Sequence, residues 1–201
     1  MKTNKCILRM MFFAIGTAFL MASCNTCRLQ PGDLLFHVAE KSNAITDVTP
    51  GMIDHVAIVI SQDSVIEAVG RGVVTTPLDS LLAQPGRYVL GKVSKANRRQ
   101  SVRNARQYLG RSYDYLYLPD NADIYCSELV EFSFVDRRGQ KLFQPVPMSF
   151  HDSTGTITDY WKKFYARHGM DVPEGKPGTN PGELSQRKEV RLKPDAIIKK
   201  R

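Results

Sequence analysis

The chain has 201 residues, of which 42% are hydrophobic and 24% charged, and a formal net charge of +8. The length predicts one domain with a hydrophobic core. The excess basic charge lies at the two ends, since residues 1–23 carry +3, residues 187–201 carry +5 and the part between them is neutral overall. This distribution excludes the broad basic surface that would indicate a nucleic-acid partner.

The first residues have the pattern of an export signal. Three basic residues precede an apolar run over residues 10–22, which is too short to span a membrane comfortably. The run continues into Leu-Met-Ala-Ser-Cys, which resembles a bacterial lipobox ending at Cys24. We therefore expect residues 1–23 to be a lipoprotein signal peptide and Cys24 to be lipidated in an exported, membrane-anchored protein of the bacterial cell envelope. Ordinary cleavage near Ser23 and an uncleaved anchor are the alternatives.

Signal cleavage divides the rest of the chain into a domain at 24–186 and a basic tail at 187–201. The tail is expected to be solvated or to contact anionic lipid headgroups. Cys27 and Cys126 are then the thiols that remain beside the lipidated one, and they form no disulfide framework of the kind usual in exported proteins. A lone Cys126 in an oxidising compartment indicates either reactivity or burial as a small apolar side chain.

Short apolar and β-branched runs separated by turns predict an antiparallel meander. The expected strands are one within residues 28–36 and others at 54–60, 65–69, 73–75 and 87–93. Helical spacing and end signals predict four helices. These are expected at 76–84, 97–109, from about 125 onward and 158–168. The first should begin with Thr76 as its cap and Pro77 at the first helical position, and the chain from Pro173 onward is expected to be loop.

Cys126 lies at the predicted first turn of a helix, with Asp123 as a possible cap. A helix N-terminus lowers the pKa of a thiol, and its free N–H groups can hold an oxyanion. His55 begins an apolar strand, and Glu67 follows on the next one. If these strands pair through the turn at 61–64, the carboxylate can orient the imidazole, which in turn can serve a thiol nucleophile. The alternative is that Cys126 and His55 are ordinary residues of the hydrophobic core.

Five motifs occur in an order that resembles one known family. They are GDLLF at 32–36, HVAIV at 55–59, IEA at 66–68, GRSYD at 110–114 and YCSELV at 125–130. Together they resemble the circularly permuted branch of the NlpC-type papain-like cysteine hydrolases, the YiiX/YaeF-like proteins, to which lecithin retinol acyltransferase is distantly related. In unpermuted relatives the cysteine helix precedes the histidine strand, whereas here it follows. The resemblance covers about residues 30–185.

The resemblance implies an α+β, permuted papain-like (NlpC-like) fold in which a small antiparallel sheet or barrel packs against helices. It implies that Cys126 is the nucleophile, His55 the general base and Glu67 the residue that orients the histidine. Tyr113 matches a tyrosine that stands close to the cysteine and helps to stabilise the oxyanion, although three further tyrosines crowd the same region. Asp33 matches a turn acid with a structural role.

The resemblance further implies a cysteine hydrolase or amidase, or an acyltransferase, acting on a lipid-like or acylated substrate at the cell envelope. A cell-wall peptide endopeptidase is the alternative, and a non-catalytic lipid- or peptide-binding lipoprotein is the second alternative. Most aromatic side chains after Cys126 are expected in the core, with some lining an apolar channel to the thiol. No cofactor and no metal are expected, because His37, His151 and His168 lack metal-ligand spacing.

Overall fold

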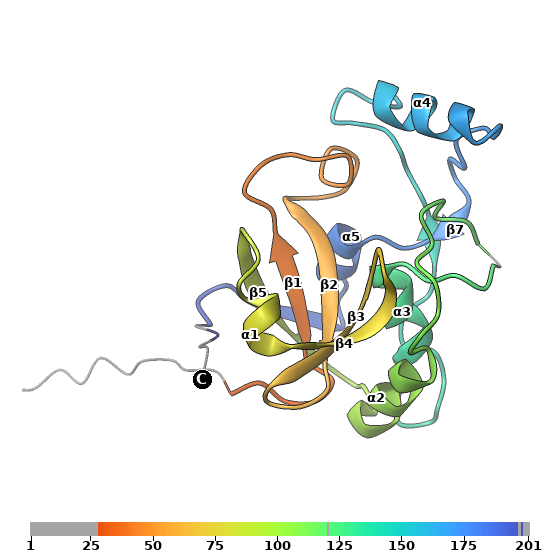
Figure 1. Cartoon of the computed structure of the whole chain (residues 1–201). Coiled ribbons are helices and arrows are strands. Elements are labelled where there is room, and N and C mark those ends of the chain that lie inside the picture. The colour runs from red at the N-terminus through yellow and green to blue at the C-terminus, as the bar shows by residue number, and fades with distance from the viewer. Residues whose placement is uncertain (1–27, 120, 197, 199–201) are drawn as a thin grey trace, which may run out of the picture.

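A six-stranded antiparallel sheet organises the computed structural model, which describes residues 28–119, 121–196 and 198 (Figure 1). The predicted signal peptide, Cys24 and Cys27 lie outside the described residues. The strands of this sheet are β1 Leu34–Val38, β2 Ile53–Val59, β3 Ser64–Val69, β4 Gly72–Pro77, β5 Arg87–Val93 and β8 Val190–Lys193. Their order is β4-β3-β2-β1-β5-β8, so β1 is a central strand between β2 and β5, and the C-terminal β8 lies at one edge.

The N-terminal strands confirm the predicted meander. β2 and β3 form a hairpin that pairs Ile58 with Ile66 and Val59 with Val65. β1 pairs with β2 on one side and with β5 on the other. Its Leu34, Leu35 and Phe36 are fully buried, as expected for a central strand whose two faces are both covered.

Five helices follow the sheet or interrupt it within the described chain. They are α1 Leu78–Leu81, α2 Arg98–Gln107, α3 Cys126–Ser133, α4 Asp159–Arg167 and α5 Pro181–Ser185. The helices predicted at 97–109, near 125 and at 158–168 are confirmed. The prediction for 76–84 is wrong at its start, since Thr76 lies in β4 and Pro77 is the residue that precedes the helix. Pairing of Thr76 with Val65 keeps this residue in the sheet.

The C-terminal part is more regular than a loop, which corrects the expectation from Pro173 onward. A short pair of strands, β6 Val146–Pro147 and β7 Pro177–Gly178, precedes α5. The side chain of Asn180 caps α5 by accepting a hydrogen bond from the Glu183 N–H at 2.7 Å. β8 then pairs with β5, with Leu192 opposite Gly91. Part of the predicted basic tail is therefore the edge strand of the main sheet.

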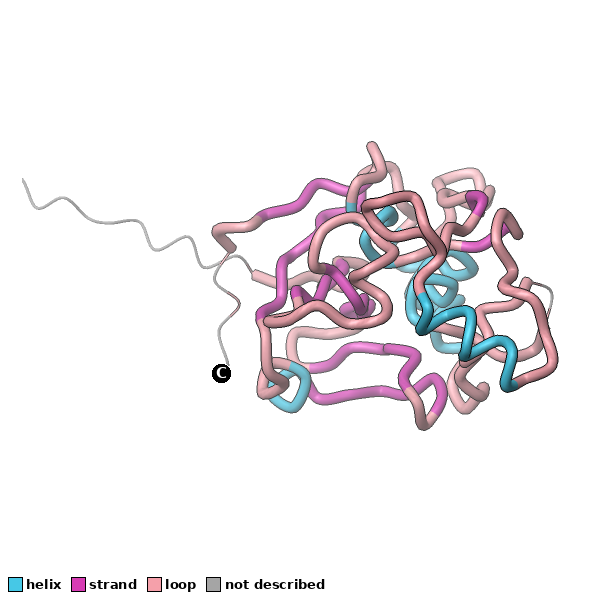
Figure 2. Tube along the Cα trace, turned by 90° about the horizontal axis from the view of Figure 1, so that it is seen from above, coloured by secondary structure: helices cyan, strands magenta, loops and turns pink. Residues whose placement is uncertain are grey.

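The two faces of the sheet bury separate hydrophobic clusters. The helices α2, α3 and α5 pack against one face through Val102, Leu129 and Leu184, among others, while α1 covers the other face. Figure 2 shows the larger helices grouped beside the strands. A third, aromatic cluster connects α4 with Tyr125, the residue just before α3. The start of α3 thus lies between the main core and this aromatic cluster.

The turn before β1 is held by a fully buried carboxylate, which agrees with the structural role expected for Asp33. Its oxygens contact Lys92 at 2.5 Å and Arg98 at 2.6 Å, and one of them accepts the N–H of Gln30 at 2.8 Å. Gly32 has a φ of +83°, which favours glycine, and a Cβ there would approach Arg98 at 3.0 Å. This turn therefore ties β1 to β5 and α2.

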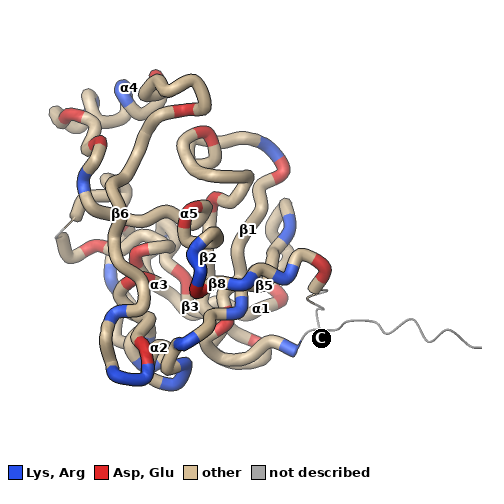
Figure 3. Tube along the Cα trace, turned by 180° about the vertical axis from the view of Figure 1, so that it is seen from behind, with Lys and Arg blue, Asp and Glu red and all other residues tan. Residues whose placement is uncertain are grey.

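Basic residues also occur within the domain, although its overall charge is balanced. Four arginines lie in α2, which contains no acidic residue, and Figure 3 shows Lys and Arg there and along the β5–β8 edge. The excess of basic charge still lies at the two ends of the chain, because acidic residues elsewhere in the domain balance these local basic residues. No helix in the described part of the chain is long and apolar enough to cross a membrane.

Candidate active site

Cys126 is the first residue of α3, as predicted, and the residue is buried, with 5% of its surface exposed. The preceding Tyr125 is extended, with φ −98° and ψ 170°, and caps the helix without a side-chain hydrogen bond. The expectation that Asp123 caps this helix is therefore wrong. The N–H of Cys126 has no partner within the helix, because the first N–H groups of any helix lack one. It is available to an oxyanion formed beside the sulfur.

His55 and Glu67 are brought together by the β2–β3 hairpin. The Nε2 atom of the histidine lies 2.7 Å from Oε2 of the carboxylate, and the two side chains are 19% and 7% exposed. A hydrogen bond with Thr76 on β4 also holds Glu67. Because Nε2 is bonded to the carboxylate, Nδ1 is the ring nitrogen that remains for the hydrogen bond between His55 and the Cys126 side chain.

The charges of this group are set by burial and by the mutual contacts. Burial opposes the charged ring, but hydrogen bonds to Cys126 and Glu67 outweigh it and raise the pKa of His55 to about 10. Burial likewise disfavours the carboxylate, but the hydrogen bond with His55 keeps the pKa of Glu67 below its usual value. The histidine is therefore an imidazolium at neutral pH, held between a sulfur and a carboxylate.

Tyr113 lines a small cavity together with Cys126, Tyr117 and Tyr125. Burial raises the pKa of the Tyr113 hydroxyl, and the nearby charge of Cys126 raises it further. The hydroxyl therefore stays protonated and can donate a hydrogen bond. In the free protein this O–H donates to the Tyr117 hydroxyl, so it must turn from Tyr117 in order to donate to an oxyanion beside Cys126. Tyr117 has a φ of +50° and lines both this cavity and the adjoining cleft.

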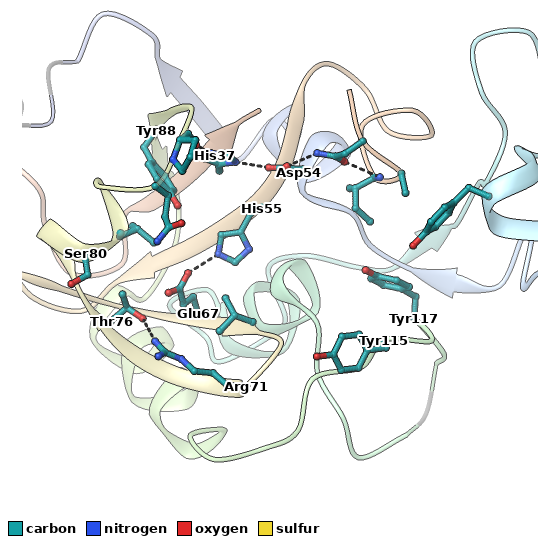
Figure 4. A pocket seen from close by; sticks show the side chains of 18 of the residues that line it. His37, Asp54, His55, Glu67, Arg71, Thr76, Ser80, Tyr88, Tyr115 and Tyr117 are labelled. Carbon is teal, nitrogen blue, oxygen red and sulfur yellow. Dashed lines mark hydrogen bonds and ion pairs between the residues drawn. The ribbon is translucent and has the colours of Figure 1, made fainter. Parts of the chain in front are cut away.

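A large open cleft adjoins the small cavity on the side of His55. Its volume is about 950 Å³, against about 50 Å³ for the cavity beside Cys126. Asp54, Tyr117 and Trp161 line both spaces. Figure 4 shows His55 and Glu67 on one wall, with Tyr115 and Tyr117 opposite. A cleft of this size is in the usual range for a small-molecule site.

A second histidine–carboxylate pair, which the sequence analysis did not recognise, lies in the same cleft. His37 is the cross-strand partner of His55, and its Nδ1 atom lies 2.6 Å from Asp54. The other oxygen of Asp54 accepts a hydrogen bond from Asn43 at 2.7 Å, and Nε2 of His37 lies 2.7 Å from the Pro85 carbonyl oxygen. These bonds tie two surrounding loops to the strands. The sequence feature that could have indicated this pair is the alternation of side chains along β1 and β2, which determines the sheet face on which each residue lies.

Glu128, on the first turn of α3, is a further residue whose role the sequence did not reveal. It is 6% exposed, and its Oε2 atom has no hydrogen-bond partner within the described structure. Burial and the neighbouring Asp114 raise the pKa of Glu128 to about 8. A hydrogen bond with the Tyr125 backbone acts in the opposite direction but does not cancel this increase. The carboxyl group therefore accepts from the backbone N–H of the residue that precedes α3, which is one half of a capping box.

The other histidines lie outside this constellation. His151 is 3.2 Å from Glu174, and His168, at the end of α4, bonds to the Phe164 carbonyl oxygen at 2.8 Å. Within the described residues, no group of three or more His, Cys, Asp or Glu side chains is arranged to hold a metal ion.

The comparisons with known proteins agree with this geometry. A family model described as permuted papain-like amidase enzyme, YaeF/YiiX, C92 family, matches residues 28–192. This chain therefore belongs to the permuted papain-like amidases of the C92 family, a class of cysteine peptidase-like enzymes. The predicted family, fold class and enzyme class are confirmed.

Two relatives can be compared directly. The uncharacterized protein YiiX of Escherichia coli K12 is 26% identical over 155 residues, which cover 72% of this chain and 75% of the relative. A crystal structure from Escherichia coli O157:H7, titled metalloprotein yiiX, has a TM-score of 0.67 at 22% identity and covers 83% of this chain and 97% of its own. At this identity the likeness shows the fold.

Proposed function

We propose that this amidase cleaves an acyl–amide bond with Cys126 as nucleophile, His55 as proton donor and acceptor, and Glu67 as the residue that orients the histidine. The observation that carries the proposal is the placement of His55, which hydrogen-bonds to both Glu67 and Cys126. A thiol nucleophile, a base and a group that orients the base make up the arrangement required for nucleophilic catalysis.

In the proposed reaction, the Cys126 sulfur attacks the carbonyl carbon and forms a tetrahedral intermediate. The Cys126 N–H and the Tyr113 hydroxyl stabilise its oxyanion. His55 gives its proton to the leaving nitrogen as the carbon–nitrogen bond breaks, which leaves a thioester. Water then attacks the thioester carbonyl while His55 takes a proton from it, and the acid and the free thiol are released. An amine or alcohol in place of water would give acyl transfer with the same residues.

Two features support an acylated or lipid-like substrate. The cavity beside Cys126 is lined mainly by apolar and aromatic side chains, including Met148 and Phe150. Aromatic residues of α4, Trp161 and Phe164 among them, line the adjoining cleft. The small volume of the cavity, about 50 Å³, favours a short acyl group or the carbonyl end of a longer chain that continues into the cleft.

A cell-wall peptide is the second candidate, and the cleft is the observation that favours it. The cleft is large and open to solvent, and polar side chains such as Asn43 and Gln84 contribute to its lining. An extended peptide with several polar groups would fit such a site more readily than it would fit a closed apolar pocket.

The proposal is tested by hydrolysis of para-nitroanilides that carry acetyl, octanoyl or palmitoyl groups, alongside peptide nitroanilides. Wild-type protein should cleave at least one acyl series and accumulate a thioester on Cys126, seen by mass spectrometry. Cys126→Ser should abolish both signals, whereas Ser153→Ala, a change on an exposed loop away from the cavity and the cleft, should keep the thioester. Cleavage that survives Cys126→Ser would overturn the proposal. Preference for the peptides would select the second candidate.

We also propose that the protein is exported and anchored at the cell envelope through a lipid on Cys24, which would place the cleft near acylated substrates. The pattern of the first 24 residues supports this. Metabolic labelling with an alkyne fatty acid should mark the wild type and leave Cys24→Ala unlabelled and released from the membrane fraction. Equal labelling of both proteins would contradict lipidation at Cys24.

A further inference from the structure

Among the described residues that line the cleft beside His55, Arg71 is the one Lys or Arg side chain, and it forms no direct ion pair. The acidic, basic and histidine side chains that line this cleft are His37, Asp54, His55, Glu67 and Arg71. The first four form two close pairs, His37 with Asp54 at 2.6 Å and His55 with Glu67 at 2.7 Å. In the described part of the chain, Arg71 forms no ion pair at contact distance, and its nearest acidic influence is Glu67, whose pKa the Arg71 charge helps to lower.

The guanidinium of Arg71 has most of its donors free of other side chains. Its Nη2 atom donates a hydrogen bond to the Thr76 hydroxyl at 3.5 Å (Figure 4), which is long for such a bond. A guanidinium has five N–H donors in a planar fork that matches a carboxylate or a phosphate group. The fork at this position therefore has unused capacity for an anion.

The turn that carries Arg71 is fixed by contacts with the loop after α2. The Tyr115 hydroxyl donates a hydrogen bond to the Gly70 carbonyl oxygen at 2.9 Å, and a Cβ at Gly70 would approach that hydroxyl at 2.7 Å. On the other side of the turn, the Val73 N–H donates to the Arg111 carbonyl oxygen at 2.8 Å. A side chain on a fixed turn loses less freedom when it binds a ligand than one on a mobile loop.

The chemistry of acyl transfer determines which part of the substrate reaches Arg71. The leaving group receives its proton from the histidine, so it must lie on the histidine side of the scissile bond. Here His55 and Arg71 line the large cleft, whereas Cys126 lines the small cavity. The acyl part therefore belongs beside Cys126, and the leaving amine or alcohol belongs in the cleft.

We propose that Arg71 binds an anionic group, a carboxylate or a phosphate, on the leaving portion of the substrate. The proposal rests on the proposed function for the direction of cleavage. It narrows the substrate class to acylated amines or alcohols that carry a negative charge close to the acylated atom. Arg71 acts on substrate selection, so its removal should affect the preference between substrates more than the chemical step.

Three octanoyl amides with matched leaving groups test this assignment. They are the amides of aminobenzoate, aminophenylphosphonate and the neutral aminobenzamide. Wild-type protein should show at least about a tenfold higher kcat/KM for an anionic amide than for the neutral one, equivalent to roughly 1.4 kcal/mol, mainly through KM. Arg71→Gln should reduce that ratio to near one, and Arg71→Lys should give an intermediate ratio. Arg106→Gln, a change on exposed α2 away from the cleft, should keep the wild-type ratio.

A binding measurement keeps this test separate from catalysis. Calorimetric titration of aminobenzoate, aminophenylphosphonate and aminobenzamide into wild-type and Arg71→Gln proteins requires no turnover. Tighter binding of an anion that is lost in the variant supports the assignment, and the anion that shows the effect identifies its source as carboxylate or phosphate. Equal binding of all three compounds, or a preference that persists in Arg71→Gln, overturns it. Hydrolysis of the neutral amide with no anion preference would leave the proposed function intact and reject the role of Arg71.

Discussion

Glu67 receives hydrogen bonds from two neighbouring strands and is the residue that fixes the orientation of His55. Its contacts with His55 and Thr76 come from β2 and β4, on either side of its own strand. Such a carboxylate holds the imidazole in one tautomer and stabilises its positive charge. The proposed chemistry should therefore be sensitive to the replacement of a single oxygen atom of the Glu67 carboxylate.

Glu67→Gln should lower the pKa of His55 from about 10 toward the ordinary 6.5, because the carboxylate is one of the groups that raise it. Nuclear magnetic resonance titration of the His55 ring proton measures this shift. We expect kcat to fall by a factor on the order of 10² to 10⁴. Asp171→Asn, an exposed control, should leave both quantities unchanged. A His55 titration that does not move in Glu67→Gln would contradict the role given to this residue.

The same pair makes stability depend on pH. Because the folded pKa of His55 lies above 6.5, its contribution is complete below about pH 6.5 and is lost as pH rises toward about 10. The lowered pKa of Glu67 adds stability above its unfolded value of 4.5, which is lost as pH falls below that value. The difference in unfolding free energy between wild type and Glu67→Gln should therefore be largest between these two unfolded values.

Tyr113→Phe removes a hydroxyl beside Cys126 and keeps the ring that lines the cavity. If this hydroxyl donates to the oxyanion, kcat should fall by about 10²- to 10³-fold with little change in KM. Steady-state kinetics on the best acyl nitroanilide measure both constants. Tyr108→Phe, in which the ring packs against Phe132 in the core, is the matched control. An unchanged kcat in Tyr113→Phe would assign Tyr113 to the cavity wall alone.

At the level of elements, the buried Asp33 connects β1, β5 and α2 and so determines how the central strand meets its neighbours. Asp33→Asn should lower the free energy of unfolding by about 1.5–3 kcal/mol, because the amide loses the charge-assisted hydrogen bonds with the partly exposed Lys92 and Arg98. Urea denaturation measures this loss. Asp79→Asn, on the exposed surface of α1, should change it by less than about 0.5 kcal/mol. A loss that small in Asp33→Asn would show that the network adds little to stability.

The sequence predicted the elements that have strong local signals. The runs that became β2 and β3 are rich in apolar and β-branched residues, and α2 ends near a glycine with a φ of +85°. The predictions failed where tertiary contacts decide. Thr76 has the pattern of a helix cap, but strand pairing with Val65 and the contact with Glu67 keep it in β4. The strand β8 is short and charged, so its sequence does not indicate a strand. It forms because the backbone groups at the edge of β5 can pair with it.

The candidate site was predictable to the extent that its residues occur in recognisable motifs. Cys126, His55 and Glu67 each lie in one, and the structure brings all three together. Asp54 and Arg71 have no such motif, because their roles depend on which loops and turns surround the cleft. Glu128 lies within a motif, yet only its burial in the fold reveals its raised pKa.

At the level of the whole molecule, the C-terminal segment completes the sheet that supports the site. β8 covers the edge of β5, and Ala196 and Ile198 pack near the cluster on the α1 side. A chain that ends after Glu189 should melt at a lower temperature and self-associate through the exposed β5 edge. A chain that ends after Ile198 should behave as the full chain does. Thermal melting and size-exclusion chromatography measure these outcomes, and equal stability of both truncations would contradict a structural role for β8.

In the permuted fold, the strand β2 that carries His55 precedes the helix α3 that carries Cys126. The catalytic proposal depends on the contact between these two residues. The most direct measurement is the alkylation rate of Cys126 by iodoacetamide across pH, followed by peptide mass spectrometry. We predict that near neutral pH Cys126 reacts at least about tenfold faster than glutathione, because a thiolate is the reactive form, and that His55→Ala removes most of this advantage. A Cys126 that reacts no faster than glutathione, with a rate unchanged by His55→Ala, would contradict the account.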